Sequence, residues 1–129
     1  MADVKLTPNQ LRRIEEVQGF LRDVAHLKRL VAELESQRGA RTVVQQRISS
    51  QIARECSQFR HRAITANIGT IADVAGALST MAGRSQGLVM KLRGLNDGIA
   101  SLSLQLDQAL KVARTPEQRP SGTAVPPDA

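Results

Sequence analysis

The C-terminal half of the chain alternates three- and four-residue spacings between mostly apolar positions without interruption. We call this set of positions, which runs from residue 74 to residue 113, the seam. Its members are Val74, Leu78, Met81, Ser85, Leu88, Leu92, Leu95, Ile99, Leu102, Leu106, Ala109 and Ala113. A period of 3.5 residues maintained over this length is typical of helices that pack along other helices. The pattern therefore predicts helical structure over most of this half.

The N-terminal region predicts a long helix over residues 8–38. Apolar side chains recur along it at helical spacing. Thr7 can cap its start, and Pro8 suits the first helical position because its missing N–H would have no partner there. Gly39 predicts the end of the helix, since glycine readily takes the left-handed conformation at that site.

A second helix is predicted over residues 42–82 and a third over residues 88–113. The segment 83–87 begins and ends with glycine, which favours a bend there. The seam keeps its phase through this segment, so one continuous helix is the alternative. Under that alternative the regularly spaced glycines form a strip where another backbone approaches closely. The glycines of this strip are Gly69, Gly76, Gly83, Gly87, Gly94 and Gly98. Of these, we expect Gly76, Gly83, Gly87 and Gly94 to allow the close approach.

These elements predict an all-α fold with two or three long helices that form an elongated helical bundle or coiled coil over residues 8–113. Residues 1–7 and the proline-rich tail, residues 114–129, are predicted to be disordered, because such sequences bury little apolar surface. The three predicted helices would be roughly 45, 60 and 40 Å long. A closed three-helix bundle would leave part of the second helix uncovered, which favours a partner.

The composition agrees with a thin helical shape. Hydrophobic residues make up 41% of the 129 residues, yet there are only two phenylalanines and no tyrosine or tryptophan. The single cysteine, Cys56, cannot form an internal disulfide. The sequence shows no signal peptide, and no apolar run approaches the ~18 residues that span a bilayer. We therefore expect a soluble cytoplasmic protein.

The net charge of +6 is concentrated in the middle of the chain. Residues 36–62 contain six arginines and a single glutamate, a net charge of +5. Arginine binds phosphates and carboxylates through a planar fork of donors. Within the segment 38–62 the candidates for an electrostatic contact with an acidic surface are Arg47, Arg54, Arg60 and Arg62. Binding of nucleic acid or of an anionic membrane surface are the alternatives, although no nucleic-acid-binding motif accompanies the arginines.

Candidate catalytic chemistry is sparse. Cys56 and His61 are five residues apart, on opposite sides of a helix, and His26 lies on another helix. One cysteine and two histidines do not supply the four ligands of a structural zinc site. The glycines form no phosphate-binding loop, because no strand precedes them and no GK[ST] sequence follows. We predict no enzymatic activity, no metal, no cofactor and no small-molecule substrate.

The seam has two interpretations, an internal core or an intermolecular coiled coil. We favour the second, because the buried area of its leucines and isoleucine is ample to drive association. The candidate partner-binding residues are Val74, Leu78, Met81, Leu88, Leu92, Leu95, Ile99, Leu102 and Leu106. The design resembles that of small coiled-coil subunits of cytoplasmic scaffolds and tethering complexes. The predicted function is a non-enzymatic structural or adaptor subunit that assembles with itself or with other helical chains.

Overall fold

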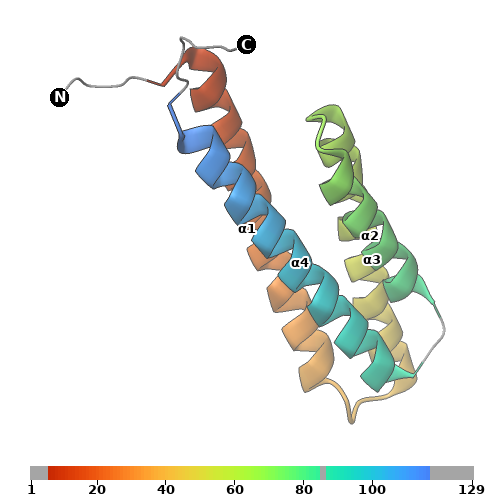
Figure 1. Cartoon of the computed structure of the whole chain (residues 1–129). Coiled ribbons are helices and arrows are strands. Elements are labelled where there is room, and N and C mark those ends of the chain that lie inside the picture. The colour runs from red at the N-terminus through yellow and green to blue at the C-terminus, as the bar shows by residue number, and fades with distance from the viewer. Residues whose placement is uncertain (1–5, 85–86, 117–129) are drawn as a thin grey trace, which may run out of the picture.

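The computed structural model describes residues 6–84 and 87–116, and these residues form four helices (Figure 1). The helices are α1 (Pro8–Ser36), α2 (Thr42–Thr65), α3 (Gly69–Gly83) and α4 (Leu88–Arg114). No strand occurs in the described part of the chain. The all-α prediction is therefore confirmed, and the prediction of two or three helices is wrong.

The four helices are arranged as two antiparallel pairs. α1 packs most extensively on α4 and α2 on α3, whereas the α1–α2 and α3–α4 contacts are smaller. Two connections, residues 37–41 and 84–87, join one pair to the other at the same end of the molecule, which we call the closed end. α1 begins and α4 ends at the opposite, open end, where residues 66–68 join α2 to α3. Figure 1 shows the two pairs diverging toward the open end.

The predicted helix over residues 42–82 is interrupted at residues 66–68, which corrects the helix count. Asn67 has a φ of 63°, in the left-handed region, and Ala66 is the C-cap of α2. The N–H of Ile68 donates to the carbonyl oxygen of Ala63 at 2.9 Å, and the N–H of Asn67 donates to that of Ile64 at 2.9 Å. This pair of hydrogen bonds is the Schellman motif, and asparagine is a residue that tolerates its left-handed position.

The predicted start of α1 is confirmed. The Thr7 hydroxyl accepts a hydrogen bond from the N–H of Gln10 at 3.1 Å, and the Gln10 side chain accepts one from the N–H of Thr7 at 2.9 Å. Pro8 occupies the first turn. This reciprocal arrangement is a capping box, which satisfies two backbone donors that the helix leaves unpaired.

The end of α1 differs from its predicted mechanism. α1 ends at Ser36, and no described glycine, Gly39 included, has a positive φ. Instead, Gln45 of α2 reaches back to this connection. Its Nε2 donates to the carbonyl oxygens of Gln37, Arg38 and Ala40 at 3.1, 3.0 and 3.2 Å. A side chain from the next helix therefore satisfies carbonyls of the connection, while the N–H groups of Gln37 and Arg38 donate to the carbonyl oxygens of Leu34 and Glu35 in the last turn.

The predicted bend at residues 83–87 is confirmed, because α3 ends at Gly83 and α4 begins at Leu88. Ser85, the polar seam position, lies outside the described residues. The predicted disorder of residues 1–7 and 114–129 falls mostly on residues 1–5 and 117–129, which also lie outside them. Within the predicted tail, Arg114 is the last residue of α4.

The bend folds the seam back so that its two halves face each other. A Cβ on Gly94 would lie 2.9 Å from the Cε of Met81, and one on Gly98 would lie 2.9 Å from the Cγ of Leu78. Only glycine allows α3 and α4 to approach this closely without displacing those side chains. Two N-terminal seam residues, Leu78 and Met81, therefore lie directly against α4.

Candidate functional site

The predicted partner-binding residues lie in the interior of the chain. Leu95, Leu102 and Leu106 are 0% exposed. Leu78, Leu92 and Ile99 are also buried, and the remaining three are half-buried and pack on the same core. Those three are Val74, Met81 and Leu88. In this structure these residues therefore belong to an internal core, which was the first of the two interpretations of the seam.

The four predicted arginines are exposed on α2 but do not form one cluster. Arg47 and Arg54 are seven residues apart and share its outward face. Arg60 lies against α3, where its Cδ is 3.0 Å from the position of a Cβ on Gly76. Arg62 turns toward α1 and donates to Asp23 at 2.7 Å. The helical repeat therefore leaves Arg47 and Arg54 as the two that face outward together.

The predicted strip of glycines is realised only in part. Gly94 lies under Met81, and Gly76 lies close to Arg60. Gly83 and Gly87 have no atom of another side chain within 4 Å of a Cβ position. They flank the bend instead. Gly69, at the start of α3, also has no such neighbour among the described residues, whereas Gly98 lies close to the side chain of Leu78.

The most prominent surface feature is a cleft between the two helix pairs at the open end, which we call the open-end cleft. Its first pocket lies between α1 and α2 and has a volume of about 560 Å³. Phe20 and Ala66 supply apolar surface there. The polar residues at this pocket include Glu16, Arg22, Asp23, His61 and Arg62.

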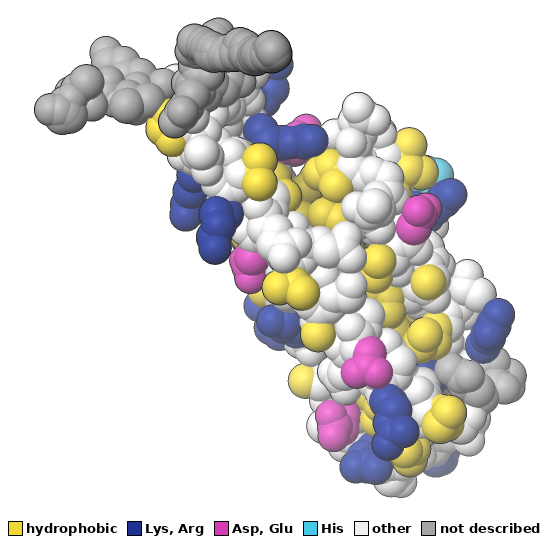
Figure 2. Space-filling model, viewed as in Figure 1, with side chains coloured by type: hydrophobic (Ala, Val, Ile, Leu, Met, Phe, Trp, Pro, Cys, Tyr) yellow, Lys and Arg dark blue, Asp and Glu magenta, His cyan; other side chains and the backbone are white. Residues whose placement is uncertain are grey.

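The second pocket of the cleft lies on the opposite side, between α3 and α4, and has a volume of about 360 Å³. Its apolar lining comes from both helices and from the connection before α3. These apolar residues are Ile68, Ile71, Ala109, Val112 and Ala113. Figure 2 shows hydrophobic side chains at the bottom of the hollow between the two pairs at this end. Arg13 is the only charged residue among those that line this pocket.

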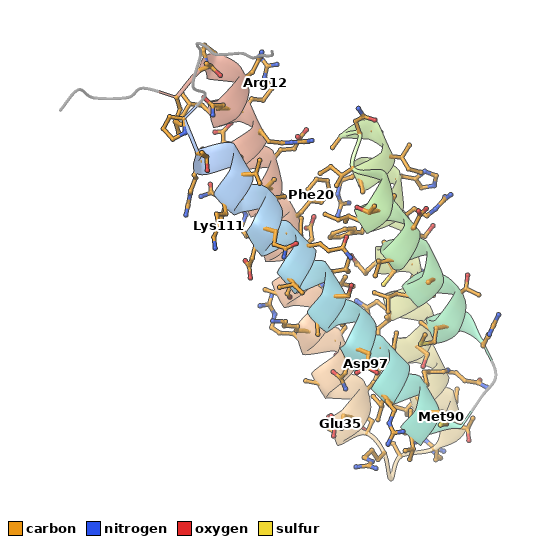
Figure 3. The ribbon with its side chains drawn as sticks, in the orientation of Figure 1. Arg12, Phe20, Glu35, Met90, Asp97 and Lys111 are labelled. Carbon is orange, nitrogen blue, oxygen red and sulfur yellow. The ribbon has the colours of Figure 1, made fainter. Side chains whose placement is uncertain are left out.

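Two contacts join the helix pairs below and across the cleft. The rings of Phe20 and Phe59 pack with their centroids 5.1 Å apart and their planes at 52°. Figure 3 shows Phe20 on the side of α1 that faces the α2/α3 pair. Above them Arg13 reaches from α1 to the end of α2. Its Nη1 donates to the carbonyl oxygen of Ala66 at 3.0 Å and to Oε1 of Glu16 at 2.8 Å.

Large apolar side chains are exposed at both ends of the molecule, and those at the closed end are Val43, Val89 and Met90. Leu11 in the first turns of α1, Ile64 in the last turn of α2 and Val112 near the end of α4 are each at least half exposed. Val112, at 72%, lines the α3–α4 pocket. A cleft with an apolar bottom and partly apolar edges is typical of a surface that binds another protein.

The candidate catalytic residues do not come together. Cys56 is buried, and burial, with a smaller contribution from Glu55, raises the pKa of its thiol to about 12. Such a thiol is a poor nucleophile at neutral pH. His26 lies 3.8 Å from Glu55, while His61 lines the α1–α2 pocket. In the described part of the chain no three His, Cys, Asp or Glu residues are grouped so that they could hold a metal ion.

Sequence reasoning missed the open-end cleft. Its one local signal is Asn67, followed two residues later by Gly69, which marks the break between α2 and α3. The other lining residues come from helices that are distant in sequence, such as Arg13 and Val112. Their proximity follows from the packing of the pairs and has no counterpart in local spacing.

The chain was compared with protein-family models, with curated proteins and with solved structures, and none of the three comparisons finds a match. No helix in the described ranges is both long and apolar enough to cross a membrane.

Proposed function

We propose that this protein is a non-enzymatic helical adaptor that binds an acidic amphipathic helix of a partner protein in the open-end cleft. The observation that carries the proposal is the apolar cleft between two helix pairs that are not joined to each other by the chain at that end. An amphipathic helix laid into an apolar groove is a recurrent mode of protein recognition.

The charge around the cleft supports an acidic partner. The charged residues that line the two pockets of the cleft are Arg13, Arg22 and Arg62 against Glu16 and Asp23, besides His61. Arg13 and Arg62 are paired with Glu16 and Asp23, but Arg22, which also lines the α1–α2 pocket, has no ion pair within the described residues. A positive surface attracts an acidic helix and speeds its association, so charge adds selectivity to the apolar contact.

Because the seam is buried, we propose the cleft and not the seam as the docking surface. Assembly through the seam leucines would require α3 and α4 to separate and expose side chains that are now 0% exposed. Each such leucine would lose roughly 1.5–3 kcal/mol of burial. Docking in the open-end cleft leaves the core intact and covers apolar surface that is exposed at present. We still propose that the protein is a subunit of a larger complex with other helical chains. The contact would be a partner helix in the open-end cleft and not the seam.

The test uses a matched pair of positions on α4. Val112 lines the α3–α4 pocket at 72% exposure, and Leu104 is 60% exposed but lies outside it. A photo-crosslinking amino acid at position 112 is expected to capture a partner in cells, and the same group at position 104 is not. Mass spectrometry of the crosslinked peptide then gives the sequence of the docked segment.

The captured segment is then purified and titrated against the natural chain and against two variants. We expect Val112→Asp to weaken binding about tenfold or more, because the new carboxylate both removes apolar contact and repels an acidic helix. Leu104→Asp should bind like the natural chain. Equal crosslinking at both positions, a captured segment without an amphipathic acidic helix, or equal binding by the two variants would contradict the proposal. Capture of nucleic acid in place of protein would favour the arginines of α2 as the functional surface.

A further inference from the structure

Lys91 is a buried cation at the closed end. The residue is only 8% exposed, although it lies in the first turn of α4. Its Nζ has one hydrogen-bond partner within the described residues, the hydroxyl of Ser49 at 3.4 Å. That distance exceeds the usual 2.7–3.2 Å range of such bonds, and a hydroxyl does not neutralise a charge. No carboxylate lies within ion-pair distance of Lys91 in the described chain.

The Lys91 side chain lines a pocket of about 300 Å³, which we call the closed-end pocket. The pocket lies between the start of α2, the end of α3 and the start of α4. Most of its lining is polar or basic, and it contains no acidic residue among the described positions. Its polar and basic residues are Thr42, Gln45, Gln46, Ser49, Ser50, Arg84 and Lys91. A buried charge without a counter-ion is costly, so such a pocket gains stability from a bound anion.

Two helix N-termini contribute to the same pocket. Thr42 and Leu88, the first residues of α2 and α4, both line it. Neither helix has a side-chain cap, and neither has an acidic residue in its first turn. The first N–H groups of a helix carry a partial positive charge and have no partner within the helix. An anion at this position would accept hydrogen bonds from these N–H groups, as an acidic capping side chain does in other helices.

We propose that the closed-end pocket binds the phosphate group of a small molecule, with Lys91 as its principal ligand. Ser49, Ser50 and Thr42 supply hydroxyl donors, and Arg84 adds a second positive charge at the mouth. This combination of a cation, hydroxyls and helix N-termini is typical of phosphate sites. The volume of the pocket is at the lower end of the range for small-molecule sites, and it leaves space beside a phosphate for a small organic group. Burial also lowers the pKa of Lys91, as expected for an ammonium that lacks its anion.

The test is calorimetric titration of the full chain with inorganic phosphate, glycerol 3-phosphate and citrate at constant ionic strength. Lys91→Met removes the charge while keeping the length and apolar character of the side chain. Lys111→Met, an exposed lysine on the same helix, is the matched control. We expect saturable binding of inorganic phosphate to the natural chain and to the control, and binding about tenfold or more weaker in Lys91→Met.

Further variants and probes cover folding and the source of the phosphate. Circular dichroism establishes that Lys91→Met is folded, and Arg84→Gln, at an exposed position, provides a second variant with a smaller expected loss. Glycerol 3-phosphate should bind at least as tightly as inorganic phosphate, and citrate more weakly than either. Absence of saturable phosphate binding, or equal binding by Lys91→Met, would overturn the proposal. Binding only to phosphatidylcholine vesicles that contain phosphatidic acid would also overturn it, in favour of a lipid surface. The proposal does not depend on the open-end cleft, because the two sites share no residue.

Discussion

The closed and open ends of this molecule are built from the same four helices but are held together in different ways. At the closed end residues 37–41 and 84–87 both cross from one helix pair to the other. Gly94 and Gly98 also allow α3 and α4 to approach closely toward that end. At the open end the chain links α2 only to α3, within one pair. Covalent connections therefore hold the pairs together at one end, and only non-covalent contacts, such as the hydrogen bond from Arg13 to Ala66, hold them together at the other.

The two ends also differ in what they leave unsatisfied. The closed end buries a cation, Lys91, that has no counter-ion among the described residues, whereas at the open end the exposed side chain of Val112 borders a pocket with an apolar lining. Both are departures from the usual distribution of polar and apolar groups. In our two proposals each departure is relieved by a different class of ligand, a phosphate group at the closed end and an amphipathic helix at the open end.

The largest expected effect compares two leucines of α4 that are both 0% exposed, Leu95 in the closed half and Leu106 beside the α3–α4 pocket. Each substitution to alanine should lower the free energy of unfolding by about 2–5 kcal/mol. We expect Leu95→Ala to lose more, because the surroundings of Leu106 can relax into the cleft. Urea denaturation of the two variants measures the difference. A larger loss at Leu106 would mean that the open end is the more rigidly packed of the two.

A second prediction concerns Arg13, which bridges the pairs at the open end. Arg13→Met removes the hydrogen bonds to Ala66 and Glu16, and we expect a loss of about 0.5–1 kcal/mol, since the side chain is partly exposed. Hydrogen exchange should quicken in the last turn of α2 and remain unchanged at the closed end. Arg12→Met is the control, because Arg12 has no ion pair in the described structure. Uniform exchange changes along α2 would show that Arg13 supports the whole fold rather than the open end.

The third prediction uses pH to probe the closed end. Because burial lowers the pKa of Lys91, the folded chain loses this proton more readily than the unfolded chain. Its penalty is therefore fully present below the lowered pKa and disappears as the pH rises toward the unfolded value of 10.5. Below that window Lys91→Met should be more stable than the natural chain, because methionine brings no uncompensated charge into this buried position. The advantage should shrink as the pH rises.

The pH experiment must compare the variant with the natural chain, because Cys56 changes the stability of both chains with pH. Its effect is opposite in sign to that of Lys91. Its thiol pKa is raised from 9.0 to about 12, so its contribution to stability is lost as the pH rises through that interval. Cys56 is present in both chains, and the difference between them isolates Lys91. Denaturation of both at several pH values gives that difference. A difference independent of pH would show that Lys91 carries no burial penalty.

The smallest expected effect concerns the rim of the open-end cleft. Val112→Asp and Leu104→Asp should each change the free energy of unfolding by less than about 0.5 kcal/mol, because both side chains are mostly exposed. Thermal denaturation followed by circular dichroism checks this. A much larger loss for Val112→Asp would mean that Val112 supports the junction of α3 and α4 and is not simply part of a free surface.

Most helix positions follow from local sequence, and so do several of their ends. Thr7, Pro8 and Gln10 form the start of α1 through contacts within four residues of each other. The glycines at 83 and 87 mark the bend before α4. The break at Asn67 is also local, but the apolar stripe of α2 continues into α3 in phase and conceals it. Interactions between near neighbours can be read from spacing because the chain itself keeps those residues together.

Long-range packing accounts for the rest. The period of the seam requires that one face of α3 and α4 be covered, but it is the same whether the chain's own helices or another protein cover it. α3 packs mainly on α2 and α4 mainly on α1, with a smaller contact between α3 and α4, and together these contacts make the seam an internal core. The same folding buries Lys91, which spacing marks only as an interruption of an apolar region, and places Arg13 beside Val112. These outcomes depend on the direction in which each connection sends the chain, and that direction is set by the packing of all four helices together.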